Sequence, residues 1–133
     1  IFNLYQGGLG MPDRDYYLNS DETSQQIRDA YAVHIEKMFT IAGFDNKEAQ
    51  QASKSVLKIE TALAKGAFTR QELRNPEANY NKLTVSELQN WVPTIDWKQY
   101  FTTLGISDMN ELVVGQEKFF KEMNKVLSSA TLD

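Results

Sequence analysis

Apolar side chains recur every three or four positions over two long stretches of the chain, which is the spacing of one buried helix face. The first stretch predicts a helix over residues 22–42, with a buried stripe of Ile27, Ala30, Tyr31, Ile35, Met38, Phe39 and Ala42. The second predicts a helix over residues 46–65, with a stripe of Ala49, Ala52, Val56, Ile59 and Leu63. Gly43 is a C-cap signal, and Asp45 and Glu48 form a capping box. Because the link is so short, we expect the two helices to pack antiparallel as a hairpin.

Shorter helices follow in the second half of the chain. Residues 69–72 could begin a short helix that must bend before Pro76, because the residue before proline disfavours helical angles. Thr84 and Glu87 form a capping box that predicts a helix ending at Pro93, with Val85, Leu88 and Trp91 on one side. Asp96 caps another helix, which Gly105 ends, and a last helix is predicted over residues 116–129, with a stripe of Phe119, Phe120, Met123, Val126 and Leu127.

Strand signals are few. Residues 1–5 are apolar and β-prone, and their pairing partner could lie outside this chain. Residues 111–114 form a second short strand between an Asp/Asn-rich turn and Gly115. The pattern therefore predicts a mainly helical single domain over residues 1–133, with about five to six helices and one or two short strands.

A turn of defined shape separates the first strand from the long helices. Gly7, Gly8 and Gly10 permit backbone angles that other residues avoid, and Pro12 fixes its own φ. Bulky apolar residues follow directly at positions 16–18, which indicates an anchor that inserts into a core.

Composition narrows the function classes. The 133 residues fit one domain, and a net charge of −4 without a basic face disfavours a nucleic-acid partner. The chain has no cysteine, which excludes disulfides and thiolate chemistry and does not separate cytosol from periplasm. No apolar stretch is long enough to cross a bilayer. The chain starts at Ile1 within an apolar segment, so we interpret both ends as cuts in a longer protein.

The candidate catalytic and metal-binding residues of the sequence are better interpreted as structural. His34 is the only histidine, and Met38 stands where a second helical zinc ligand would be, so His34 is better interpreted as structural or surface-exposed. Asp13 and Asp15 beside Arg14 could be imagined as an acid–base pair, but in a tight turn they more often bond the backbone and pair with arginines.

Two further features, the glycines near the N-terminus and a group of aromatic residues, could either stabilise the fold or bind a ligand. The glycines of residues 7–10 lack the Lys-Ser/Thr ending of a P-loop and the spacing of a dinucleotide fingerprint. The aromatic residues between positions 91 and 101 could form a ligand platform, although core packing is favoured. The sequence thus assigns no catalytic residue and no metal ligand, and it leaves the substrate-binding residues unknown.

Three motifs, taken in order, resemble one family. Residues 8–18, GLGMPDRDYYL, are similar to the GLGLPDRDYYL stretch of the neprilysin, endothelin-converting enzyme and bacterial PepO-like zinc metallopeptidases, peptidase family M13. Residues 59–64, then 74–76 and 79–84, resemble its IExxLA, RDP and YNxMT segments, and residues 95–97 continue the order. The chain departs from the family pattern at Met11, Asn75 and Leu83. Asn75 keeps the ability to form an Asx turn and loses the charge.

The resemblance implies a helical, lid-side region of the N-terminal half of such an enzyme. That region faces the catalytic domain across an enclosed cavity, which limits substrates to peptides of modest size. In the complete enzyme zinc would activate water, with a glutamate as general base. The zinc ligands of the family lie outside the residues present here, so no site residue is carried over and this segment alone is expected to be inactive.

The resemblance also sets expectations about partners and location. The partners would be peptide substrates and the catalytic half of the same polypeptide, with helix faces here that the rest of the protein covers. The lack of cysteines fits the bacterial members better than the disulfide-rich animal ectodomains, so a bacterial periplasm or cell envelope is favoured, with the cytoplasm as the other choice. Two other hypotheses stay open: a free-standing helical module that binds a peptide or protein without catalysis, and a catalytically dead paralogue.

Overall fold

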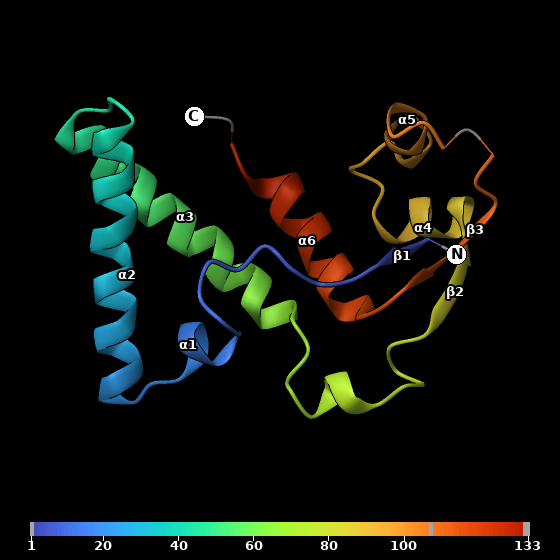
Figure 1. Ribbon diagram of the computed structural model, residues 1–133, viewed down its shortest axis with the longest axis horizontal. Coiled ribbons are helices and arrows are strands. Elements are labelled where there is room, and N and C mark those ends of the chain that lie inside the picture. The colour runs from blue at the N-terminus through green and yellow to red at the C-terminus, as the bar shows by residue number, and fades with distance from the viewer. Residues whose placement is uncertain (1, 107, 132–133) are drawn as a thin grey trace. The chain divides into compact units, whose positions relative to one another are not determined.

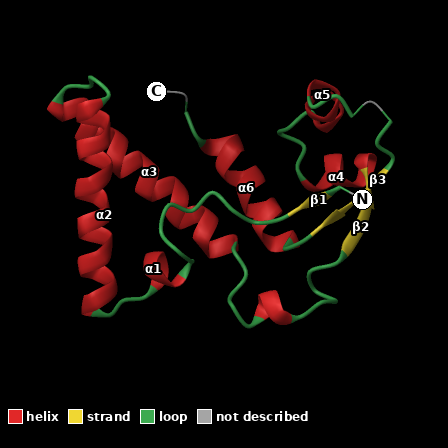
Figure 2. Ribbon diagram, in the orientation of Figure 1, coloured by secondary structure: helices red, strands yellow, loops and turns green. Residues whose placement is uncertain are grey.

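The computed structural model describes residues 2–106 and 108–131 and confirms the mainly helical class (Figures 1 and 2). Its contacts divide the chain into two compact units. We call residues 8–65 the helical unit, and residues 1–7 with 66–133 the sheet unit. The prediction that residues 1–133 form a single domain stays a prediction.

Three helices form the helical unit: α1 (Asp15–Leu18), α2 (Glu22–Ile41) and α3 (Asn46–Gly66), the last residue of which belongs to the sheet unit. The two long helices match the predicted ranges closely. The Asp21 carboxylate accepts a hydrogen bond from the backbone N–H of Ser24, which caps α2. The Asp45 and Glu48 side chains bond each other's backbone N–H groups and cap α3, as predicted.

The link between α2 and α3 is short because Gly43 adopts a φ of +102°, which costs other residues strain. From this tip α3 slopes away from α2 as it returns (Figure 1). The two helices touch through the Ser53 hydroxyl, which donates to the carbonyl oxygen of Ala32 at 2.8 Å. The predicted hairpin is therefore present, with a splayed geometry.

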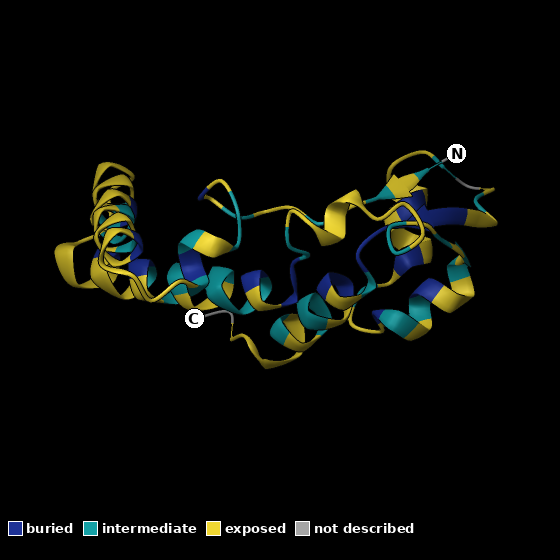
Figure 3. Cartoon of the chain, turned by 90° about the horizontal axis from the view of Figure 1, so that it is seen from below, coloured by how far each residue is buried: buried dark blue, intermediate teal, exposed yellow. Residues whose placement is uncertain are grey.

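The predicted buried stripe of α2 is wrong for about half of its members. Ile35 is buried, while Tyr31 and Phe39 are half-buried. The other four predicted members are exposed: Ile27, Ala30, Met38 and Ala42. Figure 3 shows exposed residues along most of this helix, at the left of the view. On α3, Ile59 is likewise exposed. The apolar arc of α2 is wider than the part of the helix that packs within its own unit.

The sheet unit contains β1 (Asn3–Leu4), a short 3-10 helix (Glu72–Arg74), β2 (Asn81–Thr84), α4 (Val85–Trp91), α5 (Trp97–Thr103), β3 (Glu111–Val114) and α6 (Glu117–Ser129). The sheet has the strand order β1-β3-β2. β1 runs parallel to β3, with Leu4 opposite Val114, and β2 runs antiparallel to it, with Leu83 opposite Leu112.

This topology corrects the prediction for the first strand and adds a third. The partner of β1 lies within the chain, at β3, more than a hundred residues later in the sequence. A short strand carries too little apolar periodicity to identify its partner, so the register was out of reach. β2 was not predicted, because its four residues were interpreted only as the approach to the Thr84 capping box.

The core of the sheet unit lies on β3 and the helices around it. Leu112, Val113 and Val114 are buried on β3. The helices contribute Leu88 and Val92 at α4, Trp97 and Phe101 on α5, and Phe119 and Phe120 on α6. The Phe2 ring packs edge-on against Phe101, with ring centroids 5.3 Å apart, and so draws the N-terminal strand into this core. Leu127, the last member of the predicted α6 stripe, is exposed.

Candidate functional site

Two tyrosine hydroxyls meet one carboxylate inside the helical unit. Tyr17 Oη donates to Glu60 Oε2 at 2.6 Å, and Tyr31 Oη lies 3.1 Å from the same oxygen. The backbone N–H of Met11 donates to Tyr17 Oη at 2.9 Å. These four residues, the tyrosine–glutamate cluster, come from the glycine-rich turn, α1, α2 and α3. One carboxylate therefore ties the turn and three helices together.

The electrostatics of the cluster favour neutral tyrosines. Burial raises the pKa of Tyr17 well above its usual range, and the hydrogen bond and charge of Glu60 raise it further, although the Met11 N–H acts in the opposite direction. Burial also raises the pKa of Tyr31, followed by the negative charge of Glu60. Tyr17 is 4% exposed, and its hydroxyl already has both a donor and an acceptor. The cluster is built to hold a shape, and it offers no activated nucleophile.

Gly10 is a close-approach position in this cluster. A Cβ atom at residue 10 would stand 1.9 Å from Tyr31 Oη, far inside any real contact distance. Tyr31 reaches Glu60 along this path, so a side chain at residue 10 and the Tyr31 hydrogen bond exclude each other. Gly7, by contrast, has nothing within 4 Å of its virtual Cβ.

Two charged side chains, Asp13 of the turn and Arg28 of α2, bond the backbone around α1. Asp13 Oδ1 accepts from the N–H of Asp15 at 2.8 Å, which is the predicted Asx-type bond at the start of α1. Arg28 of α2 donates through Nη1 to the carbonyl oxygens of Tyr16 and Asn19, at 2.9 and 2.7 Å. The Arg28 guanidinium thus bonds carbonyl groups at the C-terminal end of α1 that have no partner within the helix. The helix dipole favours a positive charge at this end.

His34 is exposed on α2. Within residues 2–106 and 108–131, no three His, Cys, Asp or Glu side chains lie close enough to hold a metal ion. The residues described here therefore do not fit a zinc site. Within the same ranges, no helix is long and apolar enough to cross a membrane.

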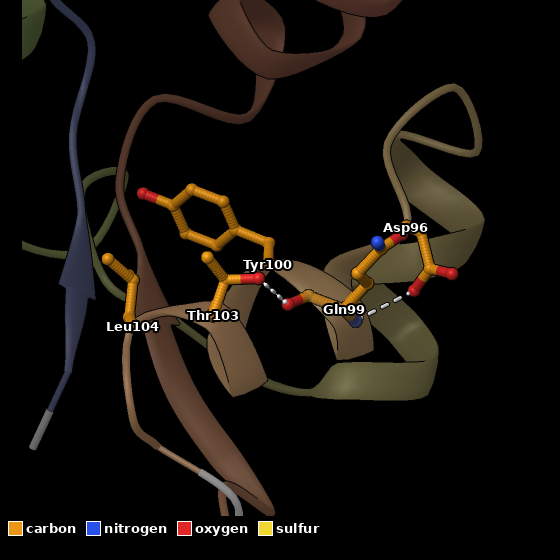
Figure 4. Close-up of a pocket in the computed structure, with 5 residues that line it drawn as sticks. All are labelled: Asp96, Gln99, Tyr100, Thr103 and Leu104. Carbon is orange, nitrogen blue, oxygen red and sulfur yellow. Dashed lines mark hydrogen bonds between the residues drawn. The ribbon is translucent and has the colours of Figure 1, made fainter.

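The aromatic cluster of residues 91–101 packs mostly as core. Trp97 is buried, and its indole Nε1 donates to the carbonyl oxygen of Val92 at 3.0 Å. Tyr100 remains 42% exposed and stacks edge-on against Trp97. A shallow surface pocket of about 310 Å³ lies along α5 (Figure 4). It is lined by Asp96, Gln99, Tyr100, Thr103 and Leu104.

A second polar network, which sequence reasoning missed, is buried in the sheet unit. Gln116 is 2% exposed and has a left-handed φ of +33°. Its Oε1 accepts from the N–H of Gln6 at 2.7 Å, and its Nε2 donates to Asn79 Oδ1 at 2.6 Å. The Gln6 side chain in turn bonds the backbone N–H and carbonyl of Phe68. The network joins four segments that are far apart in sequence, and no local pattern marks it.

Three solved structures that are similar to this chain are of one zinc metalloprotease. The zinc metalloprotease Zmp1 of Mycobacterium tuberculosis in its open state matches 98% of this chain with a TM-score of 0.87 and 28% identity. Zmp1 in complex with an inhibitor matches 97% of the chain with a TM-score of 0.86 and 29% identity. In both cases the match covers 20% of the Zmp1 chain.

The sequence comparisons identify the family. Endothelin-converting enzyme 1 of Cavia porcellus is 28% identical over 134 residues, which is 97% of this chain and 18% of the relative. Residues 1–133 match the model of peptidase family M13 along their whole length, and the chain belongs to this family. It spans about a fifth of the length of these relatives.

Proposed function

We propose that these residues are a segment of a zinc-dependent metalloendopeptidase that cleaves oligopeptides near hydrophobic residues. The match of residues 1–133 to peptidase family M13 carries this proposal. A relative named endothelin-converting enzyme 1 and a neighbour named a zinc metalloprotease support it. Because the described residues do not fit a metal site, the zinc ligands in this proposal belong to other parts of the polypeptide.

The proposed contribution of this segment is to cap the substrate cavity. The tyrosine–glutamate cluster and the Gln116 network supply what a cap needs, since both hold backbone segments in fixed shapes without exposing reactive groups. A rigid cap would limit the substrate to peptides of modest size. The partners in this proposal are peptides and the catalytic half of the same polypeptide, and the proposed location is a bacterial periplasm or cell envelope.

The test uses the complete protein encoded by the gene that contains these residues. We expect stoichiometric zinc by elemental analysis, and cleavage of a short peptide that stops when the zinc is removed with a chelator. Placing the same peptide sequence inside a long unfolded protein should abolish cleavage, because the cavity would exclude it. Efficient cleavage of the long substrate would refute the cap. A complete protein without zinc and without peptidase activity would refute the enzyme and favour a peptide-binding module or a dead paralogue.

The 133-residue chain by itself should neither bind zinc nor hydrolyse peptides. Stoichiometric zinc in the purified chain would contradict this assignment of the ligands. Reading the gene downstream of residue 133 gives an independent check, because the enzyme requires a His-Glu-x-x-His motif there.

A further inference from the structure

Four lysines form a straight row along the exposed side of α3. They are Lys47, Lys54, Lys58 and Lys65, at successive intervals of seven, four and seven residues. At 3.6 residues per turn these positions fall within an arc of about 40° around the helix, and at 1.5 Å per residue they extend over about 27 Å. All four residues are exposed. We call them the lysine row.

The lysine row contains no opposite charge. Within the part of the chain that the structure describes, none of its four ammonium groups forms an ion pair. The two acidic residues of α3 are engaged on other sides of the helix: Glu48 accepts from the backbone N–H of Asp45, and Glu60 accepts from the tyrosine hydroxyls. The other residues on the side of the row are uncharged: Gln50, Gln51, Thr61 and Ala62. The net charge of −4 led us to expect no basic face, and α3 corrects this expectation.

The fold gains nothing from this arrangement of charge. Lys54 and Lys58 stand at positions i and i+4, where like charges repel each other and lower the stability of a helix. A surface that only keeps a helix soluble usually mixes both signs, because opposite charges at this spacing stabilise the helix. The buried residues Ala49, Ser53 and Ala64 lie on the other side of α3 and do the packing. The lysine row therefore has the character of a binding surface for an anionic partner.

The shape of the row narrows this partner. Neighbouring lysines are about 6 Å or 10 Å apart along the axis, so a single phosphate or carboxylate could contact no more than two of them. A single-stranded nucleic acid is typically held in a positively charged groove, whereas this row lies on the convex surface of one helix. A helix contacts a plane along one line, and an arc of about 40° presents all four ammonium groups to that plane together.

We propose that the lysine row docks the protein on the surface of a bilayer that contains anionic phospholipids. Ala62 is the only apolar residue on this side, so the contact is electrostatic and does not require insertion. The negative charge of Glu60 on the other side of α3 opposes docking little, because a helix with its side chains is about 10–12 Å wide and the Debye length is about 8 Å. The proposal goes beyond the proposed function, since it holds whether or not the protein cleaves peptides.

Sedimentation of the complete protein with lipid vesicles tests the proposal. One set of vesicles is pure phosphatidylcholine, and the other contains about one third anionic phosphatidylglycerol. We expect at least about tenfold tighter binding to the anionic vesicles at low salt. This preference should disappear as sodium chloride is added, because salt screens exposed charges. Equal binding to the two sets of vesicles, or no binding to either, would overturn the proposal.

Paired substitutions assign the binding to the lysine row. Lys54→Gln combined with Lys58→Gln should weaken binding to anionic vesicles about 25-fold, because each lysine near such a surface contributes about fivefold. The control combines Lys37→Gln with Lys98→Gln, which removes the same charge from two exposed lysines outside the row. It should change binding by less than about twofold. Equal weakening by the two pairs would mean that total charge drives binding, and would refute the row.

Two further measurements complete the test. Glutamine has nearly the helix propensity of lysine, so an unchanged far-UV circular dichroism spectrum is expected for both pairs and excludes unfolding as the cause of weaker binding. The second measurement replaces the vesicles by single-stranded DNA. Binding of DNA that depends on Lys54 and Lys58, without binding of anionic vesicles, would identify a linear polyanion as the partner and refute the bilayer.

Discussion

The sharpest test of the cluster chemistry is to replace Tyr17 by phenylalanine. The ring of Tyr17 is buried beside Met11 and Ala64, and Tyr17→Phe keeps that packing while removing one oxygen. The change deletes the 2.6 Å hydrogen bond to Glu60 and the acceptor of the Met11 N–H. Its effect on stability therefore reports the two polar contacts and little else.

The expected loss is about 3 kcal/mol. A hydrogen bond to a charged group contributes about 1.5–3 kcal/mol, and a buried N–H left without an acceptor costs about 1–3 kcal/mol. We expect a free-energy loss in the lower part of the summed range because Glu60 is only half-buried. Water can therefore replace part of the hydrogen bond that Glu60 loses. Tyr31 also keeps its hydrogen bond to the carboxylate. A loss of this size is a large part of the about 5–15 kcal/mol that stabilises a typical domain.

Urea unfolding followed by far-UV circular dichroism measures the effect, because the helical unit dominates that signal. Tyr16→Phe is the matched control: it removes a hydroxyl from the neighbouring half-buried residue, and we expect it to change stability by less than about 0.5 kcal/mol. Equal effects of the two substitutions would show that the Glu60 contact does not hold the turn.

The same variant predicts a pH dependence with a definite sign. The folded-state pKa of Tyr17 is raised above its usual value of 10.0, so its contribution is complete below pH 10. As the pH rises above 10, the unfolded chain releases the proton while the folded chain retains it, and the stability of the native state falls. Tyr17→Phe should therefore lose less stability between pH 10 and pH 11 than the natural chain does. A steeper loss in the variant would contradict the raised pKa.

The remaining predictions concern single sites. Gly10→Ala should destabilise the helical unit by about 2 kcal/mol or more, since the new Cβ displaces Tyr31 from Glu60, whereas Gly7→Ala should stay within about 0.5 kcal/mol in the same urea assay. Gln116→Leu should cost about 2–4 kcal/mol by thermal unfolding, because it leaves the backbone N–H of Gln6 without its acceptor and Asn79 Oδ1 without its donor. A neutral result would mean that water replaces the glutamine. Thr84→Ala should lower the free energy of unfolding by about 1 kcal/mol through the loss of the α4 capping box. Ser86→Ala, in the first turn of the same helix but outside the capping box, should not lower it by that amount.

The positions of the long helices could be predicted from the sequence because the signals that mark helix ends are local. Capping boxes at Asp45 and Thr84 depend only on residues within one turn, and the structure confirms both. The short helix α1 was hidden, because a four-residue helix after three glycines and a proline leaves no periodic pattern. The side of α2 that is buried was equally hidden. Its apolar residues span too wide an arc to say which part contacts α3, where the Ser53 hydroxyl bonds the Ala32 carbonyl between the two helices.

The candidate site was beyond sequence reasoning for a related reason. The pairing of Tyr17 with Glu60 spans 43 residues, and that of Gln6 with Gln116 spans 110. Neither residue of either pair stands out by type, since tyrosine, glutamate and glutamine are common on ordinary surfaces. What could have signalled the first cluster is the resemblance itself, because it places Tyr17 and Glu60 in two separate motifs.

The structure gives a physical reason why those two motifs occur together. The first motif, residues 8–18, supplies Gly10, Met11 and Tyr17, while the second, residues 59–64, supplies Glu60 and the fully buried Ala64. Tyr17 and Met11 pack against Ala64, and the hydroxyl of Tyr17 reaches Glu60 one turn earlier on α3. Gly10 must lack a side chain for Tyr31 to approach the same carboxylate. The motifs are thus two halves of one folded junction, and changing either half leaves the other with an unfilled space or an unpaired polar group.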